Sequence, residues 1–175
     1  REALDPHLKI AGKVLDTKLP IKDRLIAAVK AGIFYSTWYP KQWLPIYSNL
    51  PADIHPKLRS KLRYVQRTSK RLARALFHSM VIGGPKLDKQ QLLLGRLAEI
   101  GTELFVITAC VLRCNKQLRG SDPKVQMLDL VNCIDARSRA KIEDNFAKLS
   151  NNNDVNNYKL AKKILGKEFQ WLETV

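Results

Sequence analysis

The residues of this 175-residue sequence that most clearly point to chemistry are the basic residues of one short run. From Lys57 to Arg74 there are eight lysines and arginines and no acidic residue. Steps of three and four residues place five of them on one face of a helix: Arg59, Arg63, Arg67, Lys70 and Arg74. Such a face is either simply solvated or attracts an anion, such as a membrane phosphate, a nucleic acid or a phosphorylated ligand.

Aromatic residues are concentrated directly before this basic run. Residues 34–47 hold six of the chain's 13 aromatic residues, together with Pro40 and Pro45. The two prolines argue against one continuous amphipathic helix. The segment is therefore either a pad that packs on another domain or a surface that meets lipid headgroups, where tryptophan and tyrosine concentrate. The rings could also stack on bases, although no nucleic-acid module signature accompanies them. The candidate surface residues are Trp38, Tyr39 and Trp43.

The sequence shows no local sign of a reaction centre. It lacks the glycine-rich phosphate loops, the nucleophile elbow and the zinc-protease helix, so we assign no catalytic or cofactor-binding residue. Glu99 and Glu103 are four residues apart and could pair as two carboxylates. We expect them instead to bond Arg96 or basic residues of a neighbouring helix.

The cysteines predict neither a disulfide framework nor a metal site. Cys110 and Cys114 share a helix face, but Cys133 and the three histidines stand at unrelated positions, so we expect apolar buried cysteines and no metal. An odd number of cysteines and the lack of an Asn-x-Ser/Thr sequon favour a reducing intracellular compartment. The uncharged runs are too short to cross a bilayer.

Spacing and breaks predict an all-α fold. Glycine, proline and asparagine cluster at residues 83–85, 120–123 and 151–154, where helices should stop or start. In the segment 87–119, six apolar residues form one stripe: Leu93, Leu97, Ile100, Leu104, Ile107 and Val111. An adjoining stripe, Leu94, Ala98, Gly101, Phe105, Thr108 and Leu112, predicts that this helix is central, with more than one partner helix. A fourth helix is expected from about Val155 to the end.

We therefore predict an up-and-down bundle of three to four long helices, preceded by a proline- and aromatic-rich segment with one shorter helix. Residues 1–50 would be the linker or docking segment, and residues 51–175 the bundle. A length of 175 residues and 45% hydrophobic residues are typical of a folded domain rather than a disordered chain, and the net charge of +15 favours anionic partners. Because the first residue is Arg1, we expect an excised or processed piece.

The predicted central helix also carries a family resemblance. Leu92–Glu99 (LLLGRLAE), followed by Glu103–Phe105, Arg113 and Leu118, resembles the C-terminal helical extension of very-long-chain acyl-CoA dehydrogenases. His55–Leu58 looks like the His-Pro start of that extension's first helix. Pro123, Cys133–Ala136 and Lys141–Ile142 look like its later helix. The resemblance covers roughly residues 51–150, and residues 1–50 are similar to the segment that joins it to the catalytic domain.

The resemblance implies a role that is accessory rather than catalytic. In this family FAD accepts a hydride from the acyl β-carbon after a glutamate removes the α-proton, and both groups belong to upstream catalytic domains. The resemblance implies an extension that packs on those domains, accompanies homodimers and helps to hold the enzyme at a membrane. The compartment would be the cytoplasm or the mitochondrial matrix, with peripheral attachment to the inner membrane. The alternative is a free-standing basic helical module that binds nucleic acid or another polyanion.

Overall fold

The structure, a computed structural model, describes residues 19–45 and 48–174. Its helices are α2 (Ile21–Lys41), α3 (Pro56–Gly83), α4 (Gln91–Leu118), α5 (Met127–Lys148) and α6 (Asp154–Leu165). Two short 3-10 helices, η1 (Gly84–Lys89) and η2 (Gln170–Thr174), follow α3 and α6. No strand occurs among the residues that are described, so the predicted all-α fold is confirmed.

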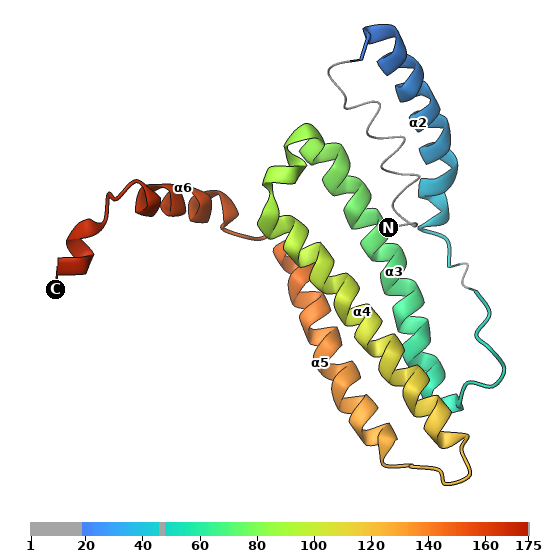
Figure 1. Cartoon of the computed structure of the whole chain (residues 1–175). Coiled ribbons are helices and arrows are strands. Elements are labelled where there is room, and N and C mark those ends of the chain that lie inside the picture. Colours follow the sequence, from blue (N-terminus) through green and yellow to red (C-terminus); the bar gives the residue numbers. More distant parts are fainter. Residues whose placement is uncertain (1–18, 46–47, 175) are drawn as a thin grey trace.

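Helices α3, α4 and α5 form an up-down-up bundle with short connections (Figure 1). At the start of α3, Pro56 takes a first-turn position that needs no backbone donor, and the His55 side chain accepts a hydrogen bond from Lys57 N at 3.3 Å. At its end, Gly84 adopts a φ of +46°, which favours glycine. The breaks predicted at residues 83–85, 120–123 and 151–154 therefore match the three ends of these helices.

The core follows the predicted stripe of α4. Leu97, Ile100, Leu104, Ile107 and Val111 are all buried, and Leu58 of α3 and Ile142 of α5 pack with this set. The adjoining stripe behaves differently, because Phe105 is 71% exposed and Leu112 50% exposed. The prediction that both stripes are covered is therefore wrong for these two residues. Helices α3 and α5 both lie on one side of α4 and contact each other there, through pairs such as Lys61 with Asp135.

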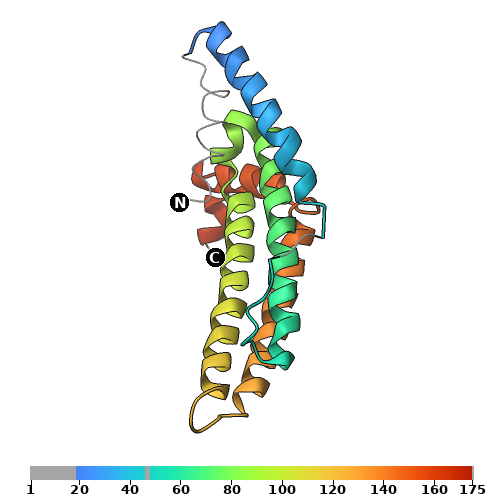
Figure 2. The same cartoon turned by 90° about the vertical axis from the view of Figure 1, so that its right-hand side faces the viewer.

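Helix α2 runs further than the sequence predicts. The aromatic segment as far as Lys41 continues the helix, so the prediction that its prolines break it is wrong for Pro40. Proline lacks a backbone donor and disturbs the turn before it, and α2 ends one residue after Pro40, at Lys41. In Figures 1 and 2 the last turns of α2 lie beside α3, whereas its start projects past the end of the bundle.

Helix α6 does not join the bundle as a fourth member. It ends at Leu165 rather than continuing to the end of the chain, none of its residues is buried, and it projects sideways from the bundle (Figure 1). Val155, Ile164 and Leu165 remain exposed. The apolar spacing correctly predicts a helix here, but among the residues that the structure describes nothing buries its apolar side.

Candidate functional site

The eight basic residues of α3 divide into three groups with different surroundings. Two pair with acidic residues of α5. The Lys61 ammonium lies 3.1 Å from the Asp135 carboxylate, with both side chains buried. Arg71 lies 2.6 Å from Glu143 and also places its guanidinium 3.8 Å above the Phe146 ring. These two cations fix α5 against α3, so they are part of the bundle's own structure.

The second group binds the chain that follows α2. We call residues 42–50, apart from the undescribed positions 46 and 47, the strap. Lys70 Nζ donates to Leu44 O at 2.9 Å and to Lys41 O at 3.4 Å, and Arg74 donates to Gln42 O. The last carbonyls of a helix have no intrahelical donor and carry its negative dipole end. Lys70 and Arg74 therefore act as a tertiary cap on the C-terminal end of α2.

Further along the strap, a second pair of α3 side chains reaches Ser48. Its carbonyl oxygen accepts from Arg63 Nη1 at 3.3 Å and from Gln66 Nε2 at 2.9 Å. The guanidinium of Arg74 also lies 4.3 Å from the centre of the Trp43 ring. Arg63, Lys70 and Arg74, three of the five residues of the predicted basic face, thus meet neutral oxygens of the same chain.

The third group consists of Lys57, Arg59 and Arg67, which form no side-chain hydrogen bond or ion pair with residues that the structure describes. Arg67 is exposed and Arg59 is half-buried. The structure thus separates the predicted basic face into residues that hold the strap and residues that remain available. Whether the face binds an anion stays a prediction.

The predicted aromatic surface packs mainly on α3 of the same chain. The rings of Tyr35, Trp38 and Tyr39 surround Phe77, with centroid distances of 4.7, 6.0 and 5.1 Å. The Tyr39 hydroxyl also pairs with His78 Nε2 at 2.7 Å. Trp43 differs from these rings, because it remains 61% exposed. Of the three aromatic candidates, Trp38 and Tyr39 therefore help to dock α2, and Trp43 offers the outward surface.

A polar cluster between α4 and α5 explains the two glutamates. Glu103 is buried and accepts from Ser138 Oγ at 2.6 Å and from Lys141 Nζ at 2.7 Å, while Glu99 lies 3.9 Å from the same ammonium. The hydrogen bond from Lys141, followed by that from Ser138, holds the pKa of the Glu103 carboxyl below its usual range. The expectation that these carboxylates pair with a neighbouring helix is confirmed, and the cluster is structural.

The cysteines only partly follow expectation. Cys114 is fully buried in the core, and burial raises the pKa of its thiol, whereas Cys110 is half-buried. Cys133 is exposed, so the expectation of burial is wrong at this position. It lies on the outer side of α5, where the described part of the chain does not cover it.

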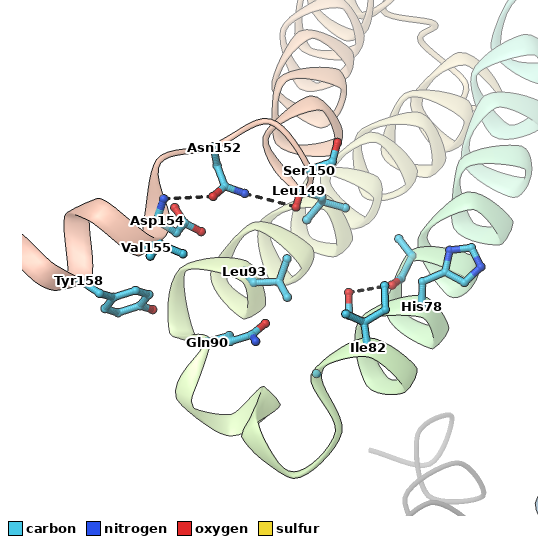
Figure 3. Close-up of a pocket in the computed structure, with 13 residues that line it drawn as sticks. His78, Ile82, Gln90, Leu93, Leu149, Ser150, Asn152, Asp154, Val155 and Tyr158 are labelled. Carbon is cyan, nitrogen blue, oxygen red and sulfur yellow. Dashed lines mark hydrogen bonds between the residues drawn. The ribbon is translucent and has the colours of Figure 1, made fainter.

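A pocket that the sequence did not predict lies at the end of the bundle. It has a volume of about 500 Å³ and is lined from α3, α4 and the α5–α6 connection, with Ile82, Leu93 and Leu149 among its apolar residues (Figure 3). The feature of the sequence that could have indicated this pocket is the pair of helix breaks at residues 83–85 and 151–154, which lie together at this end of the bundle. Its polar lining residues include His78, whose ring pairs with the Tyr39 hydroxyl, and Asp154, whose carboxylate is held by Arg96.

One side of the pocket depends on how α6 begins. Arg96 donates two hydrogen bonds to the Asp154 carboxylate, at 2.6 and 2.7 Å, and Leu92 N donates to the Tyr158 hydroxyl at 3.2 Å. These hydrogen bonds from Arg96 hold the pKa of Asp154 below its usual range. The first turn of α6 is thus fixed to α4, although the rest of the helix is exposed.

Comparison with known proteins supports the family resemblance that the sequence of the central helix indicated. The chain is 34% identical over 177 aligned residues to proteins named "Probable acyl-CoA dehydrogenase FadE10" from Mycobacterium bovis and from two strains of Mycobacterium tuberculosis. The resemblance to an acyl-CoA dehydrogenase is confirmed. The alignment covers 99% of this chain but only 27% of each relative, so the chain spans about a quarter of their length.

This coverage is consistent with the chain being a C-terminal part of such an enzyme. No family model matches the chain, and no solved structure matches it significantly. Within the described ranges, no helix is both long enough and apolar enough to pass through a lipid bilayer.

Proposed function

We propose that this chain is the C-terminal accessory domain of an FAD-dependent long-chain acyl-CoA dehydrogenase, an enzyme of fatty acid oxidation, and that it is non-catalytic by itself. The observation that carries this proposal is the similarity over 99% of the chain to one part of a much longer dehydrogenase. The sequence adds that no flavin-binding or catalytic motif is present in this part. The flavin and the glutamate base would belong to the rest of the enzyme.

The two projecting arms, α2 and α6 with η2, would dock on the upstream catalytic domains and support a homodimer. They expose large apolar side chains on elements that are otherwise well-formed helices: Ile21, Leu25, Ile26, Val29 and Ile33 in α2, and Val155, Ile164, Leu165, Trp171 and Leu172 in and after α6. Those of α2 recur at helical spacing and therefore share one face, and an exposed apolar face of this kind marks an interaction site. A docked arm would remove it from water.

The basic face of α3 would hold the enzyme peripherally at an anionic membrane, which suits a substrate with a long acyl chain. Arg59 and Arg67 are available for lipid phosphates, and Trp43 lies 61% exposed beside Arg74. Basic residues near an anionic bilayer contribute about 1 kcal/mol each. The compartment would be the cytoplasm or the mitochondrial matrix, with attachment to the inner membrane.

The accessory-domain proposal is tested on the native polypeptide, captured from its source with an antibody against this segment. We expect a chain several times heavier than 20.0 kDa that carries flavin absorption. A colourless 20.0 kDa species would contradict the proposal and would favour the polyanion-binding alternative, which predicts retarded DNA mobility with a steep salt dependence.

Membrane attachment is tested by sedimentation with vesicles of phosphatidylglycerol and phosphatidylcholine, with pure phosphatidylcholine vesicles as the neutral control. The double variant Arg59→Gln/Arg67→Gln should bind anionic vesicles at least about tenfold more weakly, since two cations are lost. The control Arg113→Gln/Lys116→Gln removes two exposed charges from α4 instead. Equal losses in both variants would mean that only net charge matters and that α3 presents no specific surface.

A further inference from the structure

The side of α4 that faces away from its two partner helices carries a regular row of exposed residues. In Figure 2, α4 lies on one side of the bundle, and α3 and α5 lie on the other. The row follows alternating steps of three and four residues and contains no charge: Gly95, Ala98, Thr102, Phe105, Ala109 and Leu112. We call this row the outer seam. Its spacing lets two helices pack along each other over several turns, here about 26 Å of helix at about 1.5 Å per residue.

The order of large and small residues along the outer seam fits a second copy that runs in the opposite direction. A two-fold axis between residues 103 and 104 sets each large side chain of one copy against a small residue of the other. Three pairs form, each of them twice: Leu112 with Gly95, Phe105 with Thr102, and Ala109 with Ala98. A parallel pairing would instead set each residue against its own copy, so the two Phe105 rings would meet and the small residues would leave gaps.

Gly95 is a member of the seam that the described part of the chain does not explain. A glycine inside a helix is less favourable than an alanine. A Cβ atom at Gly95 would meet no described atom within 4 Å, the nearby backbone of its own helix apart, so no packing within the chain needs this space. In the antiparallel arrangement the space receives the exposed side chain of Leu112 from the second copy.

Charged residues beside the seam also favour the antiparallel direction. Glu99 and Arg113 each directly follow a seam residue and stand two heptads apart, so they share one flank of α4. In an antiparallel pair these like flanks face each other, and Glu99 of one copy comes near Arg113 of the other. Arg113 is exposed and forms no side-chain hydrogen bond or ion pair with described residues, and the Glu99 side chain is half-exposed. In a parallel pair each flank would face the opposite flank, which is uncharged at Leu94, Gly101 and Thr108.

We propose that two copies of this chain pair through the outer seam of α4 as an antiparallel, two-fold symmetric contact. The contact uses no residue of the arms α2 and α6. The inference therefore goes beyond the homodimer proposed above, which the arms and the catalytic domains can support without it. Two ion pairs between Glu99 and Arg113 would flank the apolar contact and fix its direction.

Sedimentation equilibrium of the 175-residue chain measures the contact, in about 0.15 M salt to screen the net charge of +15 on each copy. We expect a dissociation constant of roughly 10–100 µM, because a contact along one helix is smaller than a standard interface. Phe105→Asp should weaken the dimer at least about tenfold, since it places a charge inside the seam. The matched control Leu25→Ser/Val29→Ser removes exposed apolar side chains from α2 and should leave the dimer unchanged.

A second variant separates the contact from the stability of the helix. Gly95→Leu fills the space that the partner's side chain would occupy, so the dimer should weaken at least about fivefold. Leucine is a better helix former than glycine, so the melting temperature of the monomer should not fall. A role of Gly95 within its own chain alone would predict no loss of the dimer.

The direction of the contact is tested by charge exchange. Arg113→Glu sets like charges against each other and should weaken the dimer about two- to tenfold, the effect of two exposed ion pairs. Adding Glu99→Arg to this variant should restore the affinity, because the pairs are then reversed. A double variant that binds no better than Arg113→Glu alone would overturn the antiparallel direction.

Cysteine crosslinking tests the direction independently, in a Cys110→Ser/Cys133→Ser background. A mixture of Ala98→Cys and Ala109→Cys chains of different tagged lengths should form mixed disulfide dimers, whereas neither variant should crosslink efficiently with itself. Crosslinking of each variant with itself only would show a parallel pairing and overturn the proposed arrangement.

The contact itself is overturned by either of two results. One is a chain that stays monomeric up to about 300 µM, and the other is a dimer that Phe105→Asp and Gly95→Leu leave unchanged. Loss of the dimer in Leu25→Ser/Val29→Ser alone would assign the pairing to α2 and also overturn the inference. None of these results decides the accessory role, which the mass and flavin absorption of the native polypeptide test separately.

Discussion

The three-helix bundle and the two arms are built from similar side chains but differ in what those side chains meet. Ile100, Ile107 and Ile142 of the bundle are fully buried, whereas Ile21, Ile33 and Ile164 of the arms are more than half exposed. Both regions form regular helices, because helix formation follows local spacing and propensity. Burial additionally needs a partner surface, and within the described residues these apolar side chains of the arms lack one. The comparison therefore separates the part of this chain that stabilises itself from the part that is available to other surfaces.

The largest effect is expected from placing a charge in the bundle core. Leu104→Asp buries an unpaired carboxylate between α4 and its neighbours, so the free energy of unfolding should fall by more than about 4 kcal/mol and the bundle should not fold cooperatively. The adjacent Phe105→Asp is the matched control, because that side chain is 71% exposed, and its effect should stay within about 0.5 kcal/mol. Thermal melts followed by circular dichroism test both. A cooperative melt of Leu104→Asp at the wild-type temperature would contradict the assignment of the core.

A smaller effect, which depends on pH, is expected from the Glu103 cluster. The pKa of the Glu103 carboxyl is lower in the folded protein than in the unfolded chain. This carboxylate therefore contributes stability that is fully present above about pH 5 and is lost as the pH falls through the lowered pKa. Glu103→Gln should cost about 1.5–3 kcal/mol at neutral pH and flatten the loss of stability in acid. Urea unfolding between pH 7 and pH 3 measures this. Parallel curves for the two proteins would show that Glu103 does not contribute to acid sensitivity.

The attachment of α6 should respond locally rather than globally. Arg96→Gln removes both hydrogen bonds to Asp154, so the first turn of α6 should detach and the Leu92 amide should exchange with deuterium at least about tenfold faster. The melting temperature of the bundle should hardly change, because α6 contributes no buried residue. Exchange at the amide of Ile107 in the core serves as the internal reference. A large drop in melting temperature would mean that α6 belongs to the cooperative unit.

The smallest effect is expected from the arm α2. Leu25→Ser/Val29→Ser replaces two exposed apolar side chains, so the stability of the isolated chain should change by less than about 0.5 kcal/mol. The same change in the complete enzyme should loosen the proposed contact with the catalytic domains, which limited proteolysis would detect as faster cleavage near α2. Equal cleavage rates in variant and wild type would argue that α2 covers nothing there.

The sequence by itself determined the local features of this protein. The positions of the breaks, the buried stripe from Leu97 to Val111, the role of His55 at the start of α3 and the pairing of Glu103 with a neighbouring helix all follow from spacing and residue type. The family resemblance also came from the residues of the central helix. The helix ends and the buried stripe depend on contacts within a few turns of the chain. The pairing of Glu103 follows from its charge, because a buried carboxylate needs a basic or hydrogen-bonding partner.

The tertiary structure alone decided which surfaces are covered. A regular spacing of apolar residues predicts a helix at α6 and a second stripe on α4, but it carries no information on whether another helix lies opposite. The basic face shows the same limit. Its spacing predicts a stripe of five cations, whereas the fold brings the strap's carbonyl oxygens, more than ten residues away in sequence, onto Arg63, Lys70 and Arg74. The fold of the whole chain determines which residues distant in sequence come into contact. Neutral backbone oxygens leave no signature in the residue types, so the sequence could not predict that these oxygens would meet the cations.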